Sequence, residues 1–257
     1  MSIELRPSSS LTLAKRTTLF NAAYEGYLVP FHIDEHQLAF MDDAFDLDLD
    51  ASRVAFRDGQ PVGLGNLGVR GEDAWIGGVG VVASARRSGV GEAVMRALHE
   101  QAQERRVRRV WLEVIVENTG ASALYEKLGY ERVQDVEVWT LPAAEGEQAG
   151  REVPVAEAKA RLPERHEPWQ RADGTLAHYD DVQGLVTDTG AMLFCVRSSA
   201  QLQQYTGEPE PLLQALRSYN DVYALNLPVD DPAVQVLGDL GGSVVVRQHE
   251  MLLDLPH

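Results

Sequence analysis

The sequence predicts an α/β (α+β) fold in which helices flank a mixed central sheet, followed by a second, smaller domain of related design. Three observations support this prediction. Strand-like and helix-like segments alternate from residue 3 to residue 141, a glycine-rich turn joins a buried strand to a long amphipathic helix, and part of the first half recurs in the second. With 257 residues, 44% of them apolar and 24% charged, the composition is that of a globular protein.

Hydrophobic periodicity and turn residues locate the elements of the first half. Asp58-Gly59 is a turn pair that joins two strands into a hairpin. Asp34 is a suitable helix N-cap, and Gly129 stands where a helix C-terminal cap belongs. The expected strands are residues 3–6, 54–57, 62–69, 75–82, 110–116 and 131–141, and the expected helices are residues 11–24, 34–45, 90–102 and 119–128.

The chain is expected to hold two domains, although its length alone does not decide between one and two. Residues 142–150 are rich in Ala, Glu and Gly, which is typical of a linker. We therefore expect a first domain over residues 1–142, a linker over residues 143–152 and a second domain over residues 153–257.

The second domain contains an internal repeat of the first. When the chain is shifted by 112 residues, several positions pair with the same residue type, and the order of strand, helix, capping glycine and strand is preserved. The pairs are Val110 with Val222, Ala121 with Ala233, Leu128 with Leu240, Gly129 with Gly241, Val133 with Val245, and also Gly78 with Gly190. We interpret the pattern as a duplicated half-fold, with a strand over residues 191–197 and a loop over residues 198–211.

A strand, a short loop and a helix follow one another at residues 75–102. The loop supplies Arg86, Gly89 and Gly91, and the helix begins directly after it. Glycines let backbone N–H groups approach an anion closely, and a helix N-terminus carries a positive partial charge to which Arg86 adds. The segment lacks the Walker and dinucleotide-fold motifs, but it suits a pyrophosphate.

Three segments together resemble the GNAT superfamily of N-acetyltransferases. Residues 81–91 are similar to that family's acyl-CoA pyrophosphate loop, residues 111–118 to its next strand, and residues 118–130 to the following helix and turn. They stand in the family's order with the family's spacing, so the resemblance implies a GNAT fold with acetyl-CoA as co-substrate. The departures are Arg87, where glycine is frequent, and Ala83, where proline is frequent; neither removes a backbone donor.

The resemblance implies a role for each matching position. Backbone groups of Val81 and Val82 pair with the pantetheine arm of the cofactor. The Asn118 amide contacts the same arm, and the Tyr125 hydroxyl protonates the departing CoA thiolate. Backbone N–H groups hold the pyrophosphate, and they belong to Arg86, Arg87, Ser88, Gly89, Val90 and Gly91.

Several of these residues also have structural interpretations. Tyr125 lies on an apolar helical stripe, so that it is either a proton donor or a core aromatic residue. Asn118 is a good N-cap and can serve in both capacities. Glu113 and Glu117 follow the strand that lines the acceptor side. Glu113 is the candidate general base, unless both carboxylates are solvated or structural.

The leading functional hypothesis is an N-acetyltransferase in which an acceptor amine attacks acetyl-CoA directly in a ternary complex. A strand N–H near Val81 stabilises the oxyanion. Tyr27, Pro30 and Phe31 are the candidate acceptor-binding residues, or else they stabilise a small helical layer. Two alternatives remain open: a non-catalytic acyl-CoA-binding regulatory protein, and a structural protein that binds no CoA.

The second domain is expected to be a degenerate GNAT-like copy. At the 112-residue shift Tyr125 becomes Leu237, which cannot donate a proton, and Asn118 becomes Asp230, which repels phosphates. The loop that follows its strand carries two carboxylates, those of Glu208 and Glu210. We therefore expect that this domain binds no CoA and instead extends the sheet, closes the acceptor cleft or forms a dimer interface.

Composition disfavours several other classes of protein. The net charge of −16 repels nucleic acid. No apolar run is long enough to span a bilayer, and the N-terminus shows no signal-peptide pattern. The lone Cys195 forms no internal disulfide, and the seven histidines show no zinc-site spacing. We therefore expect a cytoplasmic protein that uses no metal and binds neither nucleic acid nor membrane; a homodimer is left open.

Overall fold

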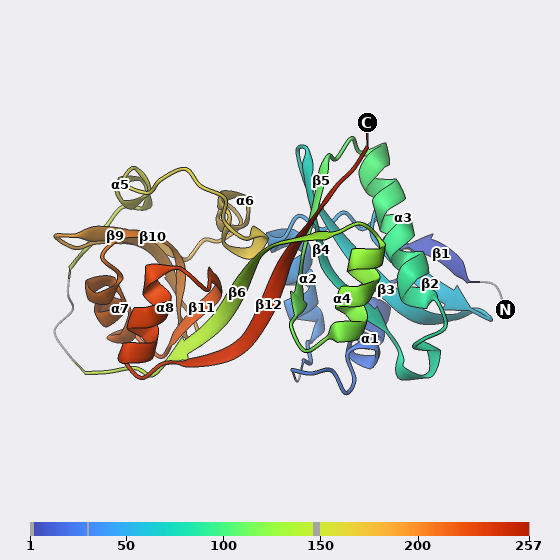
Figure 1. Ribbon diagram of the computed structural model, residues 1–257, viewed down its shortest axis with the longest axis horizontal. Helices are drawn as coiled ribbons and strands as arrows, with labels where there is room; N and C mark the ends of the chain where they lie inside the picture. The colour runs from blue at the N-terminus through green and yellow to red at the C-terminus, as the bar shows by residue number, and fades with distance from the viewer. Residues whose placement is uncertain (1–2, 30, 146–149, 257) are drawn as a thin grey trace. The chain divides into compact units, whose positions relative to one another are not determined.

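The computed structural model describes residues 3–29, 31–145 and 150–256 (Figure 1). The chain divides into two compact units. Unit 1 comprises Met1–Val133 and Glu250–His257, and unit 2 comprises Gln134–His249. Each unit has strands in a mixed sheet and hydrophobic cores of its own.

Unit 1 contains the elements that the first half of the sequence predicts, to within a few residues. Its strands follow the order β1-β2-β3-β4-β5-β12, in which β1 to β4 are antiparallel neighbours and β4 and β5 are parallel. The strands are β1 (Glu4–Pro7), β2 (Arg53–Arg57), β3 (Gln60–Arg70), β4 (Asp73–Val81), β5 (Arg109–Ile115) and the end of β12 (Ser243–Asp254). The helices are α1 (Leu13–Ala23), α2 (Glu35–Ala44), α3 (Val90–Glu104) and α4 (Thr119–Lys127), with 3-10 turns at Ser8–Ser10 and Ala83–Ala85.

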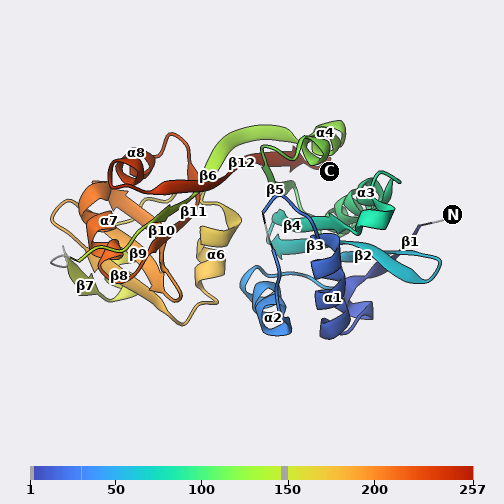
Figure 2. The same cartoon turned by 90° about the horizontal axis from the view of Figure 1, so that it is seen from below.

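The helices of unit 1 lie on both faces of its sheet (Figure 2). On one face, α1 and α2 bury apolar side chains such as Phe20 and Leu38 against β2 and β3. On the other, the apolar stripe of α3 packs with α4 over the sheet. Asp34 begins α2 with a reciprocal capping box, in which its side chain accepts from the Gln37 N–H. The predicted N-cap is therefore confirmed.

Strands β4 and β5 pair only at their beginnings. Their parallel register covers Asp73 to Trp75 of β4, and from residue 76 onward no β5 partner exists among the described residues. A bulge at Gly77-Gly78 accompanies the separation. Gly78 has φ of 139°, and a Cβ there would lie 2.5 Å from the hydroxyl oxygen of Tyr24. The backbone edge of β4 is thus left open toward β5, beside the turn that leads to α3.

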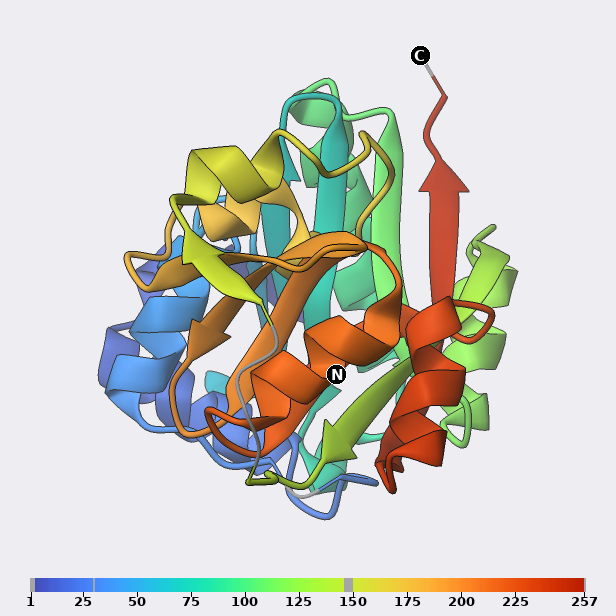
Figure 3. The same ribbon diagram turned by 90° about the vertical axis from the view of Figure 1, so that its left-hand side faces the viewer.

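Unit 2 repeats this arrangement with its own elements. Its strand order is β12-β6-β11-β10-β9-β8-β7. The strands are β6 (Glu131–Leu141), β7 (Arg151–Val153), β8 (Val182–Val186), β9 (Gly190–Val196), β10 (Ala200–Gly207), β11 (Val222–Pro228) and the first part of β12. The helices are α5 (Val155–Lys159), α6 (Asp173–Leu176), α7 (Pro209–Arg217) and α8 (Pro232–Asp239), with a 3-10 turn at Trp169–Arg171. Helices α7 and α8 pack side by side (Figure 3).

The internal repeat is more extensive than the sequence indicates. Strand β11, helix α8 and strand β12 follow one another as β5, α4 and β6 do, at the 112-residue shift. Strand β10 pairs in parallel with β11 over Ala200–Leu202 only, just as β4 pairs with the start of β5. The counterpart of β4 is therefore β10. Matching Gly78 with Gly190 is wrong as a structural equivalence, because Gly190 begins β9, and the expected loop over residues 198–211 instead contains β10.

The compact units divide the chain at other residues than the expected domain limits. From Val136 to Leu141, β6 pairs with β11, so this strand belongs to unit 2 although residues 1–142 were expected to form the first domain. Residues 250–257 belong to unit 1. The expected linker ends inside β7, and its residues 146–149 lie outside the described part of the chain. Strand pairing depends on residues far apart in the sequence, so local composition does not reveal it.

Candidate active site

The turn between β4 and α3 presents a row of backbone N–H groups. Arg87 and Gly89 have φ angles of 58° and 82°, and such left-handed residues turn successive amides toward one side. No acceptor for the N–H groups of residues 87–91 is found anywhere in the described chain. Gly89 is the N-cap of α3, whose N-terminus adds its positive partial charge. Residues 87–91 therefore form an anion cradle.

The Arg86 side chain makes a different contact from the one that the sequence predicts. Its Nε donates to the Val81 carbonyl at 3.0 Å, and its Nη2 donates to the carbonyls of Ala23 and Glu25 at 3.2 and 2.9 Å. Its own N–H donates to the Ala83 carbonyl at 3.4 Å. Arg86 thus ties the turn to the end of α1, where helix carbonyls lack helical partners, and the anion cradle begins one residue later.

Val81 and Val82 present their backbone groups in opposite directions. The Val82 N–H donates to the Val62 carbonyl at 3.0 Å, and its carbonyl accepts from the Ala85 N–H at 2.8 Å. Because donors alternate along an antiparallel strand, the Val81 N–H points away from β3, toward the side where β4 has left β5. Of the two expected pantetheine contacts, Val81 has a free N–H on the open edge, whereas Val82 is engaged within the protein.

The side chains at two positions of the anion cradle, Gly91 and Ser88, affect its shape. A Cβ on Gly91 would lie 3.7 Å from Leu124 Cδ2 and 3.8 Å from Val81 Cγ2, which are ordinary contact distances. Glycine at this position therefore leaves space beside the amides. The Ser88 hydroxyl donates to the Ala85 carbonyl at 2.6 Å and accepts from Arg57 at 2.7 Å. These bonds fix the turn, and the Ser88 backbone N–H, which is the group expected to contact the pyrophosphate, has no acceptor among the described residues.

Tyr125 lies on α4, in the core that α4 shares with α3 and the sheet. Its side chain is 8% exposed, and its hydroxyl has no hydrogen-bond partner within the described residues. Burial, and to a smaller degree the negative charge of a Tyr27 phenolate, raises the pKa of Tyr125. The phenol therefore stays protonated at neutral pH, as a proton donor must.

Asn118 is the N-cap that the sequence predicts, and its amide nitrogen makes a second contact. As N-cap of α4, its Oδ1 accepts from the Ala121 N–H at 3.3 Å. Its Nδ2 donates to the hydroxyl of Tyr27 at 3.3 Å. Because Tyr27 is also close enough to Tyr125 to raise the pKa of its phenol, Asn118, Tyr27 and Tyr125 lie in one cluster. This cluster joins the residues expected to contact the cofactor with one expected to contact the acceptor.

Tyr27 and Phe31 belong to an aromatic cluster centred on Tyr24. The ring of Tyr24 lies 5.3 Å from that of Tyr27, 5.9 Å from that of Phe31 and 4.6 Å from that of Phe20. Phe31 remains 43% exposed. Pro30, the third expected acceptor residue, lies outside the described residues. Tyr24 is not among the acceptor residues predicted from the sequence, although its spacing of three residues from Tyr27 at the end of a helix was a visible signal.

The candidate base Glu113 is held by a tryptophan. Its Oε2 accepts from the Trp75 indole Nε1 at 2.8 Å. Trp75 is the last β4 residue in register with β5 and pairs with Trp111. Glu113 lies two residues further along β5, just past the point where the strands begin to separate. Glu117, the other carboxylate considered, is exposed beyond the end of β5.

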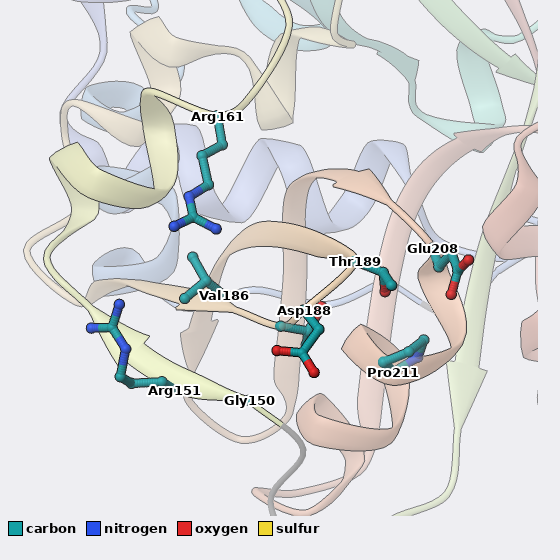
Figure 4. Close-up of a pocket in the computed structure, with 9 residues that line it drawn as sticks. Gly150, Arg151, Arg161, Val186, Asp188, Thr189, Glu208 and Pro211 are labelled. Atoms are coloured by element: carbon teal, nitrogen blue, oxygen red, sulfur yellow. The ribbon is translucent and has the colours of Figure 1, made fainter.

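The described residues of unit 2 contain no counterpart of the anion cradle. Residues 82–89 separate β4 from α3, whereas Glu208 alone separates β10 from α7. The Glu208 N–H donates to the Thr189 carbonyl at 3.3 Å. Pro209 opens α7 and has no N–H to offer. A cavity of about 850 Å³ adjoins this junction, and Figure 4 shows the carboxylates of Asp188 and Glu208 on its wall.

Side chains of unit 2 occupy the region that corresponds to the opening between β4 and β5. The hydroxyl of Tyr205, on β10, donates to the carboxylate of Asp231. The Ala233 N–H, in the first turn of α8, donates to Asp231 at 2.9 Å and to the Tyr205 hydroxyl at 3.2 Å. Leu237 is fully buried at the position of Tyr125. The Ala233 amide at the start of α8 is thus hydrogen-bonded to side chains of unit 2.

Two further observations bear on the chemistry. Cys195 is free and buried, and burial raises the pKa of its thiol to about 12, so it is inert at neutral pH. Within the described residues, no group of three or more His, Cys, Asp or Glu side chains is placed to hold a metal ion. The same residues contain no helix both long and apolar enough to cross a membrane.

Similarity to known proteins agrees with this geometry. Residues 17–130 match the model of the Acetyltransferase (GNAT) family. The [ribosomal protein bS18]-alanine N-acetyltransferase of Escherichia coli (strain K12) is 36% identical over 59 residues, which make up 23% of this chain and 40% of that protein. The chain therefore aligns with about two fifths of the length of this curated relative.

Solved structures extend the similarity to the whole chain. A putative acetyltransferase from Pyrococcus horikoshii superimposes with a TM-score of 0.69 at 21% identity, over 99% of this chain and 90% of that one. A tandem GNAT protein from the clavulanic acid biosynthesis pathway superimposes with a TM-score of 0.67 at 14% identity, over 100% of both chains. At these identities the likeness shows the fold. The predicted fold class, including a second GNAT-like part, is confirmed.

Proposed function

We propose that this chain, whose residues 17–130 match the model of the Acetyltransferase (GNAT) family, transfers an acetyl group from acetyl-CoA to an amine. The observation that carries the proposal is the combination in unit 1 of three features. These are the anion cradle at residues 87–91, the open β4 edge at Val81, and the protonated, buried phenol of Tyr125. They match a pyrophosphate, a pantetheine amide and a thiolate leaving group.

In the proposed reaction the amine and acetyl-CoA are bound together. The amine nitrogen attacks the thioester carbonyl, and an N–H of the open β4 edge near Val81 stabilises the oxyanion that forms. The C–S bond then breaks, and Tyr125 gives its proton to the CoA thiolate. Glu113, held by Trp75, takes the proton that the amine loses, directly or through water. Glu113 then releases its proton to solvent and the tyrosinate takes one from solvent, so that both groups are restored and the products are an amide and CoA.

The acceptor is proposed to enter beside Tyr27 and Phe31. The E. coli relative is named as an alanine N-acetyltransferase of ribosomal protein bS18, so α-amino groups of peptides come first among the amines to be tested, followed by lysine side chains and small amines. The net charge of −16 favours a cationic acceptor. We place the reaction in the cytoplasm and assign CoA binding to unit 1 alone.

The test is release of the CoA thiol from acetyl-CoA in the presence of an amine panel. We expect release that depends on both the amine and the protein, together with an acetylated product by mass spectrometry. Acetyl-CoA binding without transfer to any amine would instead support the non-catalytic, regulatory alternative. Failure to bind acetyl-CoA at millimolar concentration would support a purely structural protein.

A further inference from the structure

Helix α4 ends in a cap that joins Tyr125 to Tyr130. Gly129 has φ of 95°. Its N–H donates to the Glu126 carbonyl at 3.0 Å, and the Tyr130 N–H donates to the Tyr125 carbonyl at 3.0 Å. These two bonds are those of a Schellman motif, which brings the side chains at its two ends together. The rings of Tyr125 and Tyr130 accordingly lie 5.9 Å apart at an angle of 58°.

The far end of Tyr130 is fixed by α3. Its hydroxyl lies 3.0 Å from Nε2 of His99, and Tyr130 is 3% exposed. Burial, and then the charge of Arg96, lowers the pKa of His99 to about 4. Burial also raises the pKa of Tyr130. At neutral pH the imidazole is therefore neutral and the phenol protonated, so Tyr130 donates and His99 accepts.

This contact connects the two helices that carry the proposed chemistry. Helix α3 begins at the anion cradle, and nine residues after Val90 it bears His99. Helix α4 bears Tyr125. Tyr130 is bonded to both, through its hydroxyl to α3 and through its N–H to the Tyr125 carbonyl. Tyr125, the proposed proton donor, is thereby held in a fixed position relative to α3, the helix whose N-terminus is proposed to bind the pyrophosphate.

Unit 2 provides an internal comparison. Gly241 has φ of 87°, its N–H donates to the Gly238 carbonyl at 3.0 Å, and the Gly242 N–H donates to the Leu237 carbonyl at 2.8 Å. This is the same cap, with Leu237 and Gly242 in the positions of the two tyrosines. The cap therefore forms without an aromatic pair. The pair occurs in the unit that has the anion cradle and is absent from the described structure of the unit that lacks it.

We propose that Tyr130 and His99 are positioning residues that hold the Tyr125 ring in the orientation needed to protonate the leaving thiolate. The inference rests on the proposed function, because it assigns no chemistry of its own to either residue. Neither residue is placed at the acetyl-CoA or acceptor contacts. Substituting Tyr130 or His99 is therefore expected to lower kcat, whereas substituting residues of the anion cradle is expected to weaken acetyl-CoA binding.

Tyr130→Phe keeps the ring and removes the hydrogen bond. Tyr130→Leu removes the ring, which is also absent at the equivalent position of unit 2, Gly242. We expect kcat to fall about 10-fold in the first and about 100-fold in the second, since small misplacements of a reacting group have effects of this size. The dissociation constant of acetyl-CoA is expected to change less than about twofold. His99→Leu should resemble Tyr130→Phe, whereas His99→Gln, which keeps an acceptor, should retain most of the activity.

A double-mutant cycle separates positioning from general damage. Once Tyr125→Phe has removed the proton donor, adding Tyr130→Phe should lower the residual kcat no further. An equal fall in kcat in both backgrounds, or a loss of acetyl-CoA affinity that parallels the loss of turnover, would overturn the inference. An active parent protein whose Tyr130 variants keep full kcat would refute the inference alone. A parent protein that binds acetyl-CoA but acetylates no amine would refute the proposed function instead.

Discussion

Replacing Tyr125 with Phe is expected to lower kcat about 100-fold, the usual scale of one general acid. The dissociation constant of acetyl-CoA should stay within about twofold. The phenol makes no hydrogen bond to any described residue, so the fold loses none when the oxygen is removed. Because burial raises the pKa of Tyr125 above its ordinary value, the parent phenol is fully protonated at neutral pH. Loss of its proton therefore begins to limit turnover only above the ordinary pKa of tyrosine, about 10.

Steady-state kinetics at saturating amine, with calorimetric titration of acetyl-CoA, separates these two quantities. Tyr223→Phe is a matched control, because Tyr223 is a half-buried tyrosine of β11 in unit 2 whose pKa is also raised by burial. It should leave both quantities unchanged. Full activity of Tyr125→Phe would show that Tyr125 is a core aromatic residue and no proton donor.

Replacing Gly91 with Glu is expected to weaken acetyl-CoA binding about 100-fold. A Cβ at Gly91 meets only ordinary contacts, so the side chain fits on α3. Its carboxylate would stand beside the cradle amides, and two like charges about 4 Å apart repel by about 4 kcal/mol at an effective dielectric constant of about 20. An acid in the first turn favours the helix itself. The free energy of unfolding should therefore not decrease while affinity is lost.

The control is Gly91→Gln, which has the same size without the charge. Calorimetry should show that the Gln variant binds acetyl-CoA much more tightly than the Glu variant. Raising the salt concentration should reduce this difference in affinity. If the Glu and Gln variants bound acetyl-CoA equally well, the phosphates would not lie at residues 87–91.

The parts of the site that the sequence predicts are those determined by local structure. Gly89 with a left-handed φ, the N-cap Asn118 and the capping Gly129 each specify a turn or a helix end within a few residues of themselves. The apolar stripe that begins at Val90 gives α3 its length and buried face. For these features the sequence spacing is enough to locate the anion cradle and to put Tyr125 near it.

The parts that the sequence did not predict depend on partners far away in the chain. Two of the three carbonyls that accept from the Arg86 side chain lie more than sixty residues earlier. The Val82 N–H is used by β3, which depends on strand register. His99 meets Tyr130 across 31 residues, and His99 lies outside the three segments that resemble the family. Pairing of β6 with β11 moves the boundary between the units away from the Ala-rich and Glu-rich segment.

The two units share a strand and helix arrangement but differ in the groups that surround it. Both contain a parallel strand pair that separates after three residues, followed by a capped helix. Only in unit 1 does the described structure combine free turn amides with a tyrosine on that helix. At the corresponding junction of unit 2, the Glu208 N–H is bonded to the Thr189 carbonyl and Pro209 has no N–H. The fold is present twice, and we propose that the chemistry is present once.

The stoichiometry of acetyl-CoA binding to the whole chain tests this claim most directly. Isothermal titration calorimetry is expected to give one site per chain, and Gly91→Glu should remove the heat of that site without a second one becoming visible. Two sites per chain, or a site that survives Gly91→Glu unchanged, would contradict the assignment of the chemistry to unit 1.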